Sequence, residues 1–306
     1  MAPVVSVPSP QLQSDVTPRV TEQVEVVLWD GRGEPPRERI DMVVPGYMGQ
    51  DRLLRRLGEV GCHLVQSQSI GFDGVAEMLP ADIVYANAAS VHETATAELA
   101  VGLLIAAQRR LVELVDAQRE GEWHGLDAPG LADKRIVLLG YGGVGKAIAR
   151  RLDGFESDLV PVASRARTED GVTIHAIDDL AELLPQADIL VNALPGGAQT
   201  AGLIDDARLA SLPDGALLVN VGRGTTVDTD ALVDHVRRGR IRVASDVWDP
   251  EPLPAGHPLW SLDGVLITPH VGGRSGSMRP RIAKLVAEQA DRLARGEEPL
   301  NVVLRS

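Results

Sequence analysis

The residues that point most directly to chemistry form a glycine-rich stretch near the middle of the chain. Gly140, Gly142 and Gly145 follow the spacing G-x-G-x-x-G, and Gly143 and Val144 complete the stretch. An apolar run leads into it, RIVLL, and a helical pattern continues it, VGKAIARRL. In that setting the first glycine permits a tight turn, the second lets the backbone approach a pyrophosphate, and the third lets the helix lie close to the strand. The stretch therefore predicts a dinucleotide-binding turn; an ordinary strand–helix turn is the alternative.

The end of the following strand indicates which dinucleotide fits. Sites of this kind usually place Asp or Glu there, to bond the adenosine ribose. This chain instead has Ser164, Arg165 and Arg167, in the stretch LVPVASRARTED, and its first acid is Glu169. A phosphate on the ribose carries about −1.5 to −2 charge and is repelled by an acid, whereas arginine offers it paired planar donors. We therefore expect NADP(H) to be preferred and NAD(H) to be possible; the alternative is that both arginines are solvated loop charges.

The composition is that of a folded, acidic protein. Apolar residues make up 44% of the 306 residues and aromatic residues only 3%, which suits parallel strands buried under helices. A net charge of −13 disfavours nucleic acid and anionic membranes as partners. The single cysteine, Cys62, excludes an intramolecular disulfide and a cysteine-based zinc site, and its strand-like surroundings predict a buried, inert thiol. We expect no metal site, no signal peptide and no membrane span, and hence a cytosolic protein.

The elements that must position these residues fall into two regions. In the first 90 residues, strands are predicted at VEVVLW, DMVV, CHLVQ and IVYA, with a short helix at QDRLLRRLGEV. One long helix is predicted over residues 93–123, as a connector between domains or a dimer contact. Its apolar face comprises Ala100, Leu103, Leu104, Ala107, Leu111 and Leu114.

The second region alternates strands and helices. Between residues 134 and 269 strands are predicted at RIVLL, LVPVA, DILVNA, ALLVNV, RVASDV and VLIT, with helical patterns between them. This alternation is typical of a parallel sheet wound on both faces. The chain then closes with a helix and an apolar tail, which we expect to pack back on the first domain.

From about residue 67 to residue 303 the chain resembles the D-isomer-specific 2-hydroxyacid dehydrogenases. The stretches that carry the resemblance are SIGFDG, GYGGVG, NVGRGTTVDTDALVDHVRRGRI, ASDVWDPEPLPAGHPLW and ITPHVGG. The resemblance implies a two-lobed α/β fold, with a doubly wound parallel-sheet (Rossmann) cofactor domain inserted into a smaller α/β substrate domain. It assigns residues 1–93 and 275–306 to the substrate domain and residues 94–274 to the NAD(P)-binding domain. It also implies a homodimer that pairs through the cofactor domains and the long helix.

Three residues stand at the catalytic positions of that family: Arg223, Glu251 and His270. The resemblance implies that Arg223 binds the substrate carboxylate and polarises the keto oxygen, and that Glu251 bonds the far nitrogen of His270. His270 then exchanges the proton, because a histidine with an ordinary pKa of about 6.5 serves reduction and oxidation alike. Asp249 is the rival partner of His270, although the acid of the family is the one just before Pro252.

The resemblance also marks residues around the cofactor and the substrate. Backbone N–H groups of Ile70 and Gly71 are expected to hold the substrate carboxylate, and Asp246 to lie near the nicotinamide. The third cofactor loop has Gly196 and Gly197 where the family usually has Thr-Pro, so we expect a looser loop. Gly222 replaces a usual alanine, which we expect to be harmless. The remaining implied cofactor contacts are Leu194, Pro195, Val221 and Gly272.

Together with the cofactor motif, the resemblance implies a reductase that transfers a hydride between NADP(H) and a small 2-keto or 2-hydroxy acid of D configuration. Glyoxylate and hydroxypyruvate are the first expected substrates. An aryl-pyruvate reductase of the same family, or a cofactor-sensing protein like the C-terminal-binding-protein corepressors, is the alternative. A formate dehydrogenase is disfavoured, because that branch has Gln where this chain has Glu251.

Overall fold

The computed structural model describes residues 2–306 and divides the chain into two compact units. Unit 1 comprises residues 1–92 and 275–306, and unit 2 comprises residues 93–274. The sequence predicted the first domain boundary after residue 93, one residue later than in the structure, and the second after residue 274, as in the structure. Each unit is an α/β layer structure with a predominantly parallel sheet, so the predicted fold class is confirmed. None of the helices within residues 2–306 is long and apolar enough to cross a membrane.

Unit 1 is built on a six-stranded sheet in the order β14-β5-β4-β3-β1-β2. Only β14 runs antiparallel, beside β5. The four strands predicted from the sequence are present, and two further strands at the chain termini join them. The strands are β1 (Val4–Val7), β2 (Glu25–Leu28), β3 (Met42–Val43), β4 (Leu64–Gln66), β5 (Val84–Ala86) and β14 (Val302–Arg305).

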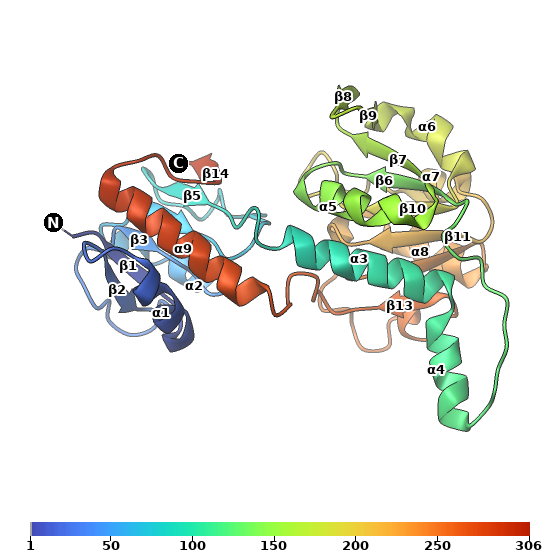
Figure 1. Cartoon of the computed structure of the whole chain (residues 1–306), viewed down its shortest axis with the longest axis horizontal. Coiled ribbons are helices and arrows are strands. Elements are labelled where there is room, and N and C mark those ends of the chain that lie inside the picture. The colour runs from blue at the N-terminus through green and yellow to red at the C-terminus, as the bar shows by residue number, and fades with distance from the viewer. Residues whose placement is uncertain (1) are drawn as a thin grey trace. The chain divides into compact units, whose positions relative to one another are not determined.

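Helices cover both faces of this sheet (Figure 1). One apolar cluster joins α1 (Pro10–Val16) and the C-terminal helix α9 (Met278–Arg295) to the sheet, through residues such as Val16 and Val286. A second cluster lies on the other face, where α2 (Asp51–Leu54) packs. The return of α9 to the first domain is therefore confirmed. Cys62 belongs to this second cluster, and its burial raises the pKa of its thiol to about 12, which fits an inert side chain.

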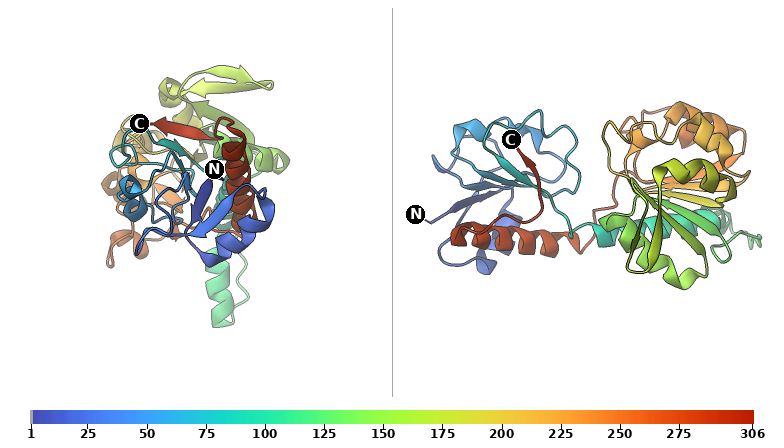
Figure 2. Two further views of the ribbon diagram at one scale, coloured as in Figure 1. Left: turned by 90° about the vertical axis from the view of Figure 1, so that its left-hand side faces the viewer. Right: turned by 90° about the horizontal axis from the view of Figure 1, so that it is seen from above.

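Unit 2 is built on an eight-stranded sheet in the order β13-β12-β11-β10-β6-β7-β9-β8. All its strands are parallel except β8, which forms an antiparallel hairpin with β9 at one edge (Figure 2). The six predicted strands are confirmed; β8 and β9 were not predicted. The strands are β6 (Arg135–Leu139), β7 (Asp158–Ala163), β8 (Arg167–Glu169), β9 (Val172–Ala176), β10 (Ile189–Asn192), β11 (Ala216–Asn220), β12 (Ile241–Ser245) and β13 (Val265–Ile267).

Successive side chains of β6 enter different cores, because neighbouring residues of a strand point to opposite faces. Ile136 and Leu138 pack with α3 (Glu93–Gln108) and α5 (Gly143–Leu152). Val137 and Leu139 pack on the opposite face, against residues of α6 (Leu180–Leu183), α7 (Asp206–Ser211) and α8 (Thr229–Arg237). The sheet is thus wound on both faces, as the alternation of strands and helices predicts.

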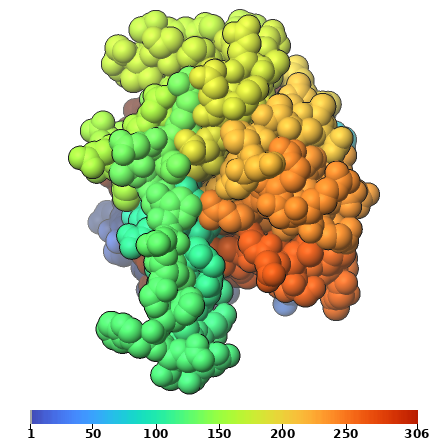
Figure 3. Space-filling model, turned by 90° about the vertical axis from the view of Figure 1, so that its right-hand side faces the viewer, coloured from blue at the N-terminus to red at the C-terminus, as the bar shows by residue number. Residues whose placement is uncertain are grey.

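The prediction of one continuous helix over residues 93–123 is wrong. Helix α3 ends at Gln108, and a separate helix, α4 (Leu111–Glu120), follows Arg110, whose φ of +51° leaves the helical region. Only the first half of the predicted face is buried, at Ala100, Leu103 and Leu104. Leu111 is 40% exposed, because α4 projects from unit 2 as the green segment at the lower end of Figure 3.

Candidate active site

The glycine turn has the geometry that a dinucleotide site requires. Gly140 has φ of +100°, and a Cβ there would lie 2.8 Å from the backbone of Ala193. A Cβ on Gly145 would lie 1.9 Å from the carbonyl oxygen of Gly140, so only glycine lets α5 approach β6 this closely. A Cβ on Gly142 would meet open space, and α5 begins at the next residue, Gly143. A pyrophosphate therefore has room at the N-terminus of α5, where free N–H groups and the helix dipole attract anions.

The side chains of the predicted ribose-binding residues differ in their hydrogen-bond partners. Ser164 and Arg165 are exposed just beyond the end of β7, and among the described residues no partner binds the Arg165 side chain. Arg167 lies on β8, and its Nε and Nη2 each donate to Glu169 Oε2 at 3.1 Å. Arg165 is therefore unpaired within residues 2–306, whereas Arg167 already has a carboxylate partner, and the binding of a cofactor by these two residues stays a prediction. Lys146 also donates to Glu169 and was missed, because nothing in the sequence places the first turn of α5 beside β8.

His270 and Glu251 form a hydrogen-bonded pair. Nδ1 of His270 and Oε2 of Glu251 are 2.7 Å apart, while the Trp248 N–H donates to Oε1 of Glu251 at 2.8 Å. Partial burial alone would raise the pKa of Glu251, but these two hydrogen bonds and the positive charge of Arg223 lower it below the ordinary value. The carboxylate is thus ionised at neutral pH and orients the His270 ring. Asp249 makes no such bond, so the structure selects Glu251 between the two acids.

A second carboxylate shapes the turn that carries His270. Asp246 is 3% exposed and follows β12. Its oxygens accept from the Thr268 hydroxyl at 2.6 Å and from the N–H groups of Val271 and Gly272 at 2.9 and 2.7 Å. The His270 N–H donates to the Asp246 carbonyl at 2.8 Å, and His270 has φ of +52°. Asp246, expected as a cofactor contact, therefore also holds the His270 turn in its shape.

Arg223 occupies the turn that follows β11. The Thr226 hydroxyl and the Asn220 amide both donate to its backbone carbonyl, at 2.6 and 3.1 Å. A Cβ on the next residue, Gly224, would lie 1.9 Å from the carbonyl oxygen of Trp248, so glycine lets the Arg223 turn pack directly on the segment that precedes Glu251. This contact brings the predicted catalytic cation and the His270–Glu251 pair to one edge of the unit 2 sheet.

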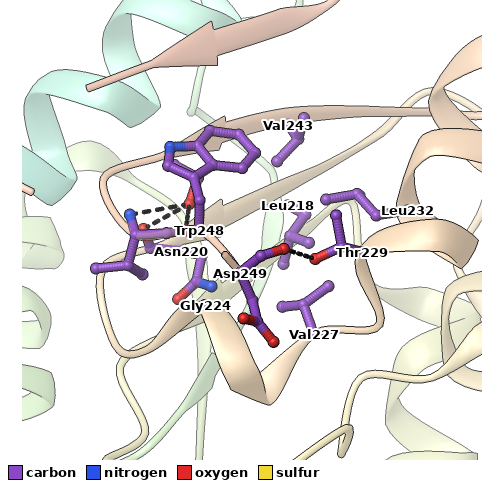
Figure 4. A pocket seen from close by; sticks show the side chains of 11 residues that line it. Leu218, Asn220, Gly224, Val227, Thr229, Leu232, Val243, Trp248 and Asp249 are labelled. Atoms are coloured by element: carbon purple, nitrogen blue, oxygen red, sulfur yellow. Dashed lines mark hydrogen bonds between the residues drawn. The ribbon is translucent and has the colours of Figure 1, made fainter. Parts of the chain in front are cut away.

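The packing beneath these turns leaves little free space. A cavity of about 10 Å³ lies between β11, β12 and α8, lined by side chains that include Leu218, Val243 and Leu232 (Figure 4). Figure 4 also shows the Thr229 hydroxyl directed at the Asp249 carbonyl, to which it donates at 2.9 Å. The segment before Glu251 is thus fastened to α8, which limits its movement.

Gly222, which packs against the third cofactor loop, departs from the expectation that its replacement of alanine is harmless. A Cβ on Gly222 would lie 2.4 Å from the Leu194 carbonyl oxygen and 2.8 Å from its nitrogen. The glycine that replaces the usual alanine therefore allows the loop of Leu194 and Pro195 to approach the end of β11, beside Val221, more closely than alanine would. The substitution is not neutral in this chain. In the same loop Thr200 donates to the Pro195 carbonyl at 2.8 Å.

The predicted substrate-binding residues Ile70 and Gly71 lie in unit 1, beyond β4. The Asn87 side chain donates to the Ile70 carbonyl at 2.9 Å and fixes this turn. Among the described residues, neither the Ile70 N–H nor the Gly71 N–H donates a hydrogen bond. Both donors therefore lack a partner within the described residues; that they bind a substrate carboxylate, as the resemblance implies, stays a prediction.

Comparisons with known proteins agree with this geometry. Residues 101–272 match the family described as D-isomer specific 2-hydroxyacid dehydrogenase, NAD binding domain. A glyoxylate reductase of Pyrococcus horikoshii is 32% identical over 309 residues, which cover 93% of this chain and 91% of that protein. A D-isomer specific 2-hydroxyacid dehydrogenase of Xanthobacter autotrophicus, solved with NADPH, has a TM-score of 0.84 at 28% identity, covering 99% and 98% of the two chains. An NADPH-dependent glyoxylate/hydroxypyruvate reductase of Sinorhizobium meliloti, solved with NADP and malonate, has a TM-score of 0.82 at 26% identity, covering 100% and 98%.

The fold and the site define a nicotinamide-dinucleotide-dependent oxidoreductase. The chain belongs to the D-isomer specific 2-hydroxyacid dehydrogenase family, so the predicted resemblance is confirmed. It is accordingly an NAD(P)-dependent enzyme that acts on small 2-keto or 2-hydroxy acids.

Proposed function

We propose that this enzyme prefers NADPH and reduces glyoxylate or hydroxypyruvate to the corresponding 2-hydroxy acid. The observation that carries the reaction is the 2.7 Å bond between His270 and Glu251, on the same sheet edge as Arg223. The observation that supports NADPH is the strand end at Ala163, which is followed by Ser164 and Arg165 in place of an acid.

The residues of the site have complementary tasks in this reaction. A nicotinamide dinucleotide held at the glycine turn of Gly140, Gly142 and Gly145 would supply the hydride for the keto carbon. Arg223 attracts the substrate carboxylate and stabilises the negative charge that develops on the keto oxygen, since a guanidinium stays charged throughout. Protonated His270 donates a proton from Nε2 to that oxygen, while Glu251 binds Nδ1 and orients the ring. In unit 1, the N–H groups of Ile70 and Gly71 are the proposed donors to a carboxylate.

Relatives support the choice of substrate and cofactor. The Pyrococcus protein is a glyoxylate reductase, and the Sinorhizobium protein is an NADPH-dependent reductase of glyoxylate and hydroxypyruvate.

A panel of 2-keto acids tests this function. Glyoxylate, hydroxypyruvate, pyruvate and phenylpyruvate are offered with NADPH and with NADH, and the loss of cofactor absorbance is followed. We expect the highest kcat/KM with glyoxylate or hydroxypyruvate, and at least about tenfold higher kcat/KM with NADPH than with NADH, as two charge-assisted bonds to a phosphate would give. Faster reduction of phenylpyruvate would favour an aryl-pyruvate reductase, and equal use of both cofactors would refute the NADPH preference.

We also propose a homodimer in which a second copy covers α4. Its exposed apolar side chains support this: Val112 is 50% exposed, Val115 is 42% exposed, and Trp123 beyond the helix is fully exposed. Such a set of side chains in water marks an interaction surface. Light scattering on a size-exclusion column should give twice the chain mass for the native protein and the chain mass for Val112→Glu/Val115→Glu; a monomeric native protein would refute the proposal.

The cytosolic location stays a prediction.

A further inference from the structure

Three charged side chains form a cluster beyond the end of β7: Lys146, Arg167 and Glu169. Arg167 and Glu169 lie two positions apart on β8, so the alternation of a strand directs both side chains to the same face. Lys146 reaches Glu169 from the first turn of α5. The cluster thus joins the glycine-turn helix to the β8–β9 hairpin.

Glu169 forms hydrogen bonds to both cations. Its Oε2 accepts from Nε and Nη2 of Arg167 at 3.1 Å, and its Oε1 accepts from Lys146. Arg167 therefore presents its Nε–Nη2 edge to Glu169, and this is one of the edges through which a guanidinium binds phosphate with two parallel bonds. The hydrogen bonds from Lys146 and then Arg167 lower the pKa of Glu169 below the ordinary value, so the carboxylate is ionised at neutral pH.

The position of the cluster gives this arrangement a consequence for the cofactor. In a Rossmann domain the adenosine ribose lies at the end of the second strand, which here is β7. Glu169 thus stands close to where a 2′-phosphate would enter. All three side chains are 31–40% exposed, so they can rearrange when an anion binds.

We propose that Glu169 sets the strength of the NADPH preference, by competing with the 2′-phosphate for Arg167 and Lys146. The inference rests on the proposed use of NADPH and deepens it. With Glu169 in place, the ribose end of the site offers Arg165 in full and Arg167 and Lys146 only in part. The affinity for NADH is then little affected by these cations. NADH has no 2′-phosphate to bind them, and Glu169 already neutralises their charge. Replacement of Glu169 by a neutral side chain frees both cations for the phosphate.

Calorimetric titration of the full chain with 2′,5′-ADP and with 5′-AMP tests this proposal without turnover. Glu169→Gln should bind 2′,5′-ADP about three- to tenfold more tightly than the native protein, as expected for removal of one exposed charge beside a phosphate. Its affinity for 5′-AMP should change less than about twofold, because that ligand lacks the 2′-phosphate. The gain should shrink at high salt.

Two further variants serve as controls. Glu182→Gln removes the same charge from an exposed position of α6 and should bind both ligands as the native protein does. Glu169→Gln should give a smaller gain in an Arg167→Ala background, because part of the effect comes from the released guanidinium. Thermal unfolding checks that each variant is folded.

Equal or weaker binding of 2′,5′-ADP by Glu169→Gln would overturn the proposal, and weaker binding would show that Glu169 orders the cations for the phosphate instead. An equal gain for 5′-AMP would also overturn it. A native protein that binds 2′,5′-ADP no more tightly than 5′-AMP would refute the NADPH preference itself. The response of Glu169→Gln to 2′,5′-ADP still decides the role of Glu169 in that case.

Discussion

Replacement of Glu251 by glutamine probes the catalytic pair most directly, because it changes charge and hydrogen bonding but hardly changes shape. The carboxylate accepts on both oxygens, from His270 at 2.7 Å and from the Trp248 N–H at 2.8 Å. A glutamine amide has one oxygen and one NH₂ group, so it satisfies only one of these two donors. Glu251→Gln therefore removes the charge opposite His270 and also leaves one donor facing another.

The size of the effect follows from the distance and the exposure. Two unit charges about 4 Å apart interact by about 1 kcal/mol in water and about 4 kcal/mol at an effective dielectric constant of 20. The His270 and Glu251 side chains are 30% and 33% exposed, so solvent screening favours the lower part of that range. We expect a loss of about 1–2 kcal/mol of transition-state stabilisation, which corresponds to about a five- to thirtyfold lower kcat/KM.

The assay is kcat/KM for keto-acid reduction with NADPH at neutral pH. In Glu251→Gln it should fall about five- to thirtyfold, because the His270 ring loses the carboxylate that orients it and the negative charge opposite it. Asp249→Asn removes the same charge two residues away, where no bond to His270 exists, and should leave kcat/KM in place. A loss in Asp249→Asn but not in Glu251→Gln would refute the assignment.

Further predictions follow from the glycines and from titration. Gly145→Ala should weaken 5′-AMP binding more than tenfold in a calorimetric titration, because its Cβ would lie 1.9 Å from the Gly140 carbonyl oxygen. Gly222→Ala should lower the free energy of unfolding by about 1–3 kcal/mol in denaturant titrations, the usual cost of overpacking; unchanged stability would show that the Leu194 loop yields freely. Because the pKa of Glu251 is lowered by folding, its contribution to stability is present above its ordinary value of 4.5 and is lost as pH falls through its folded value. The stability difference between the native protein and Glu251→Gln should therefore be constant near neutral pH and shrink only in acid.

The sequence by itself determined the parts of this protein that local pattern specifies. Apolar runs located the inner strands of both sheets, since a strand buried on both faces needs a continuous apolar run. The spacing of Gly140, Gly142 and Gly145 located the dinucleotide turn, because that turn needs glycine for reasons that lie within a few residues. Arg223 and His270 were located by the resemblance to the family, and both follow strands at the edge where ligands bind in open α/β sheets.

Tertiary structure alone decided the features that depend on contacts between distant segments. The sequence did not predict the break between α3 and α4 at Arg110, because the helical pattern of residues 93–123 continues across it. Strands β1 and β14 are short and terminal, and they exist only through pairing with β2, β3 and β5.

The same holds at the site. Asp249 and Glu251 are both acids near a turn; the resemblance favours Glu251, and the folded backbone places its carboxylate 2.7 Å from His270. From the sequence alone, Arg167 is expected to be an unpaired cation. In the structure, pairing of β8 with β9 places Arg167 on a strand with Glu169, which also binds Lys146. The sequence gives the type of each side chain. Whether a charged side chain is available to bind a ligand depends on the neighbours that the fold places beside it.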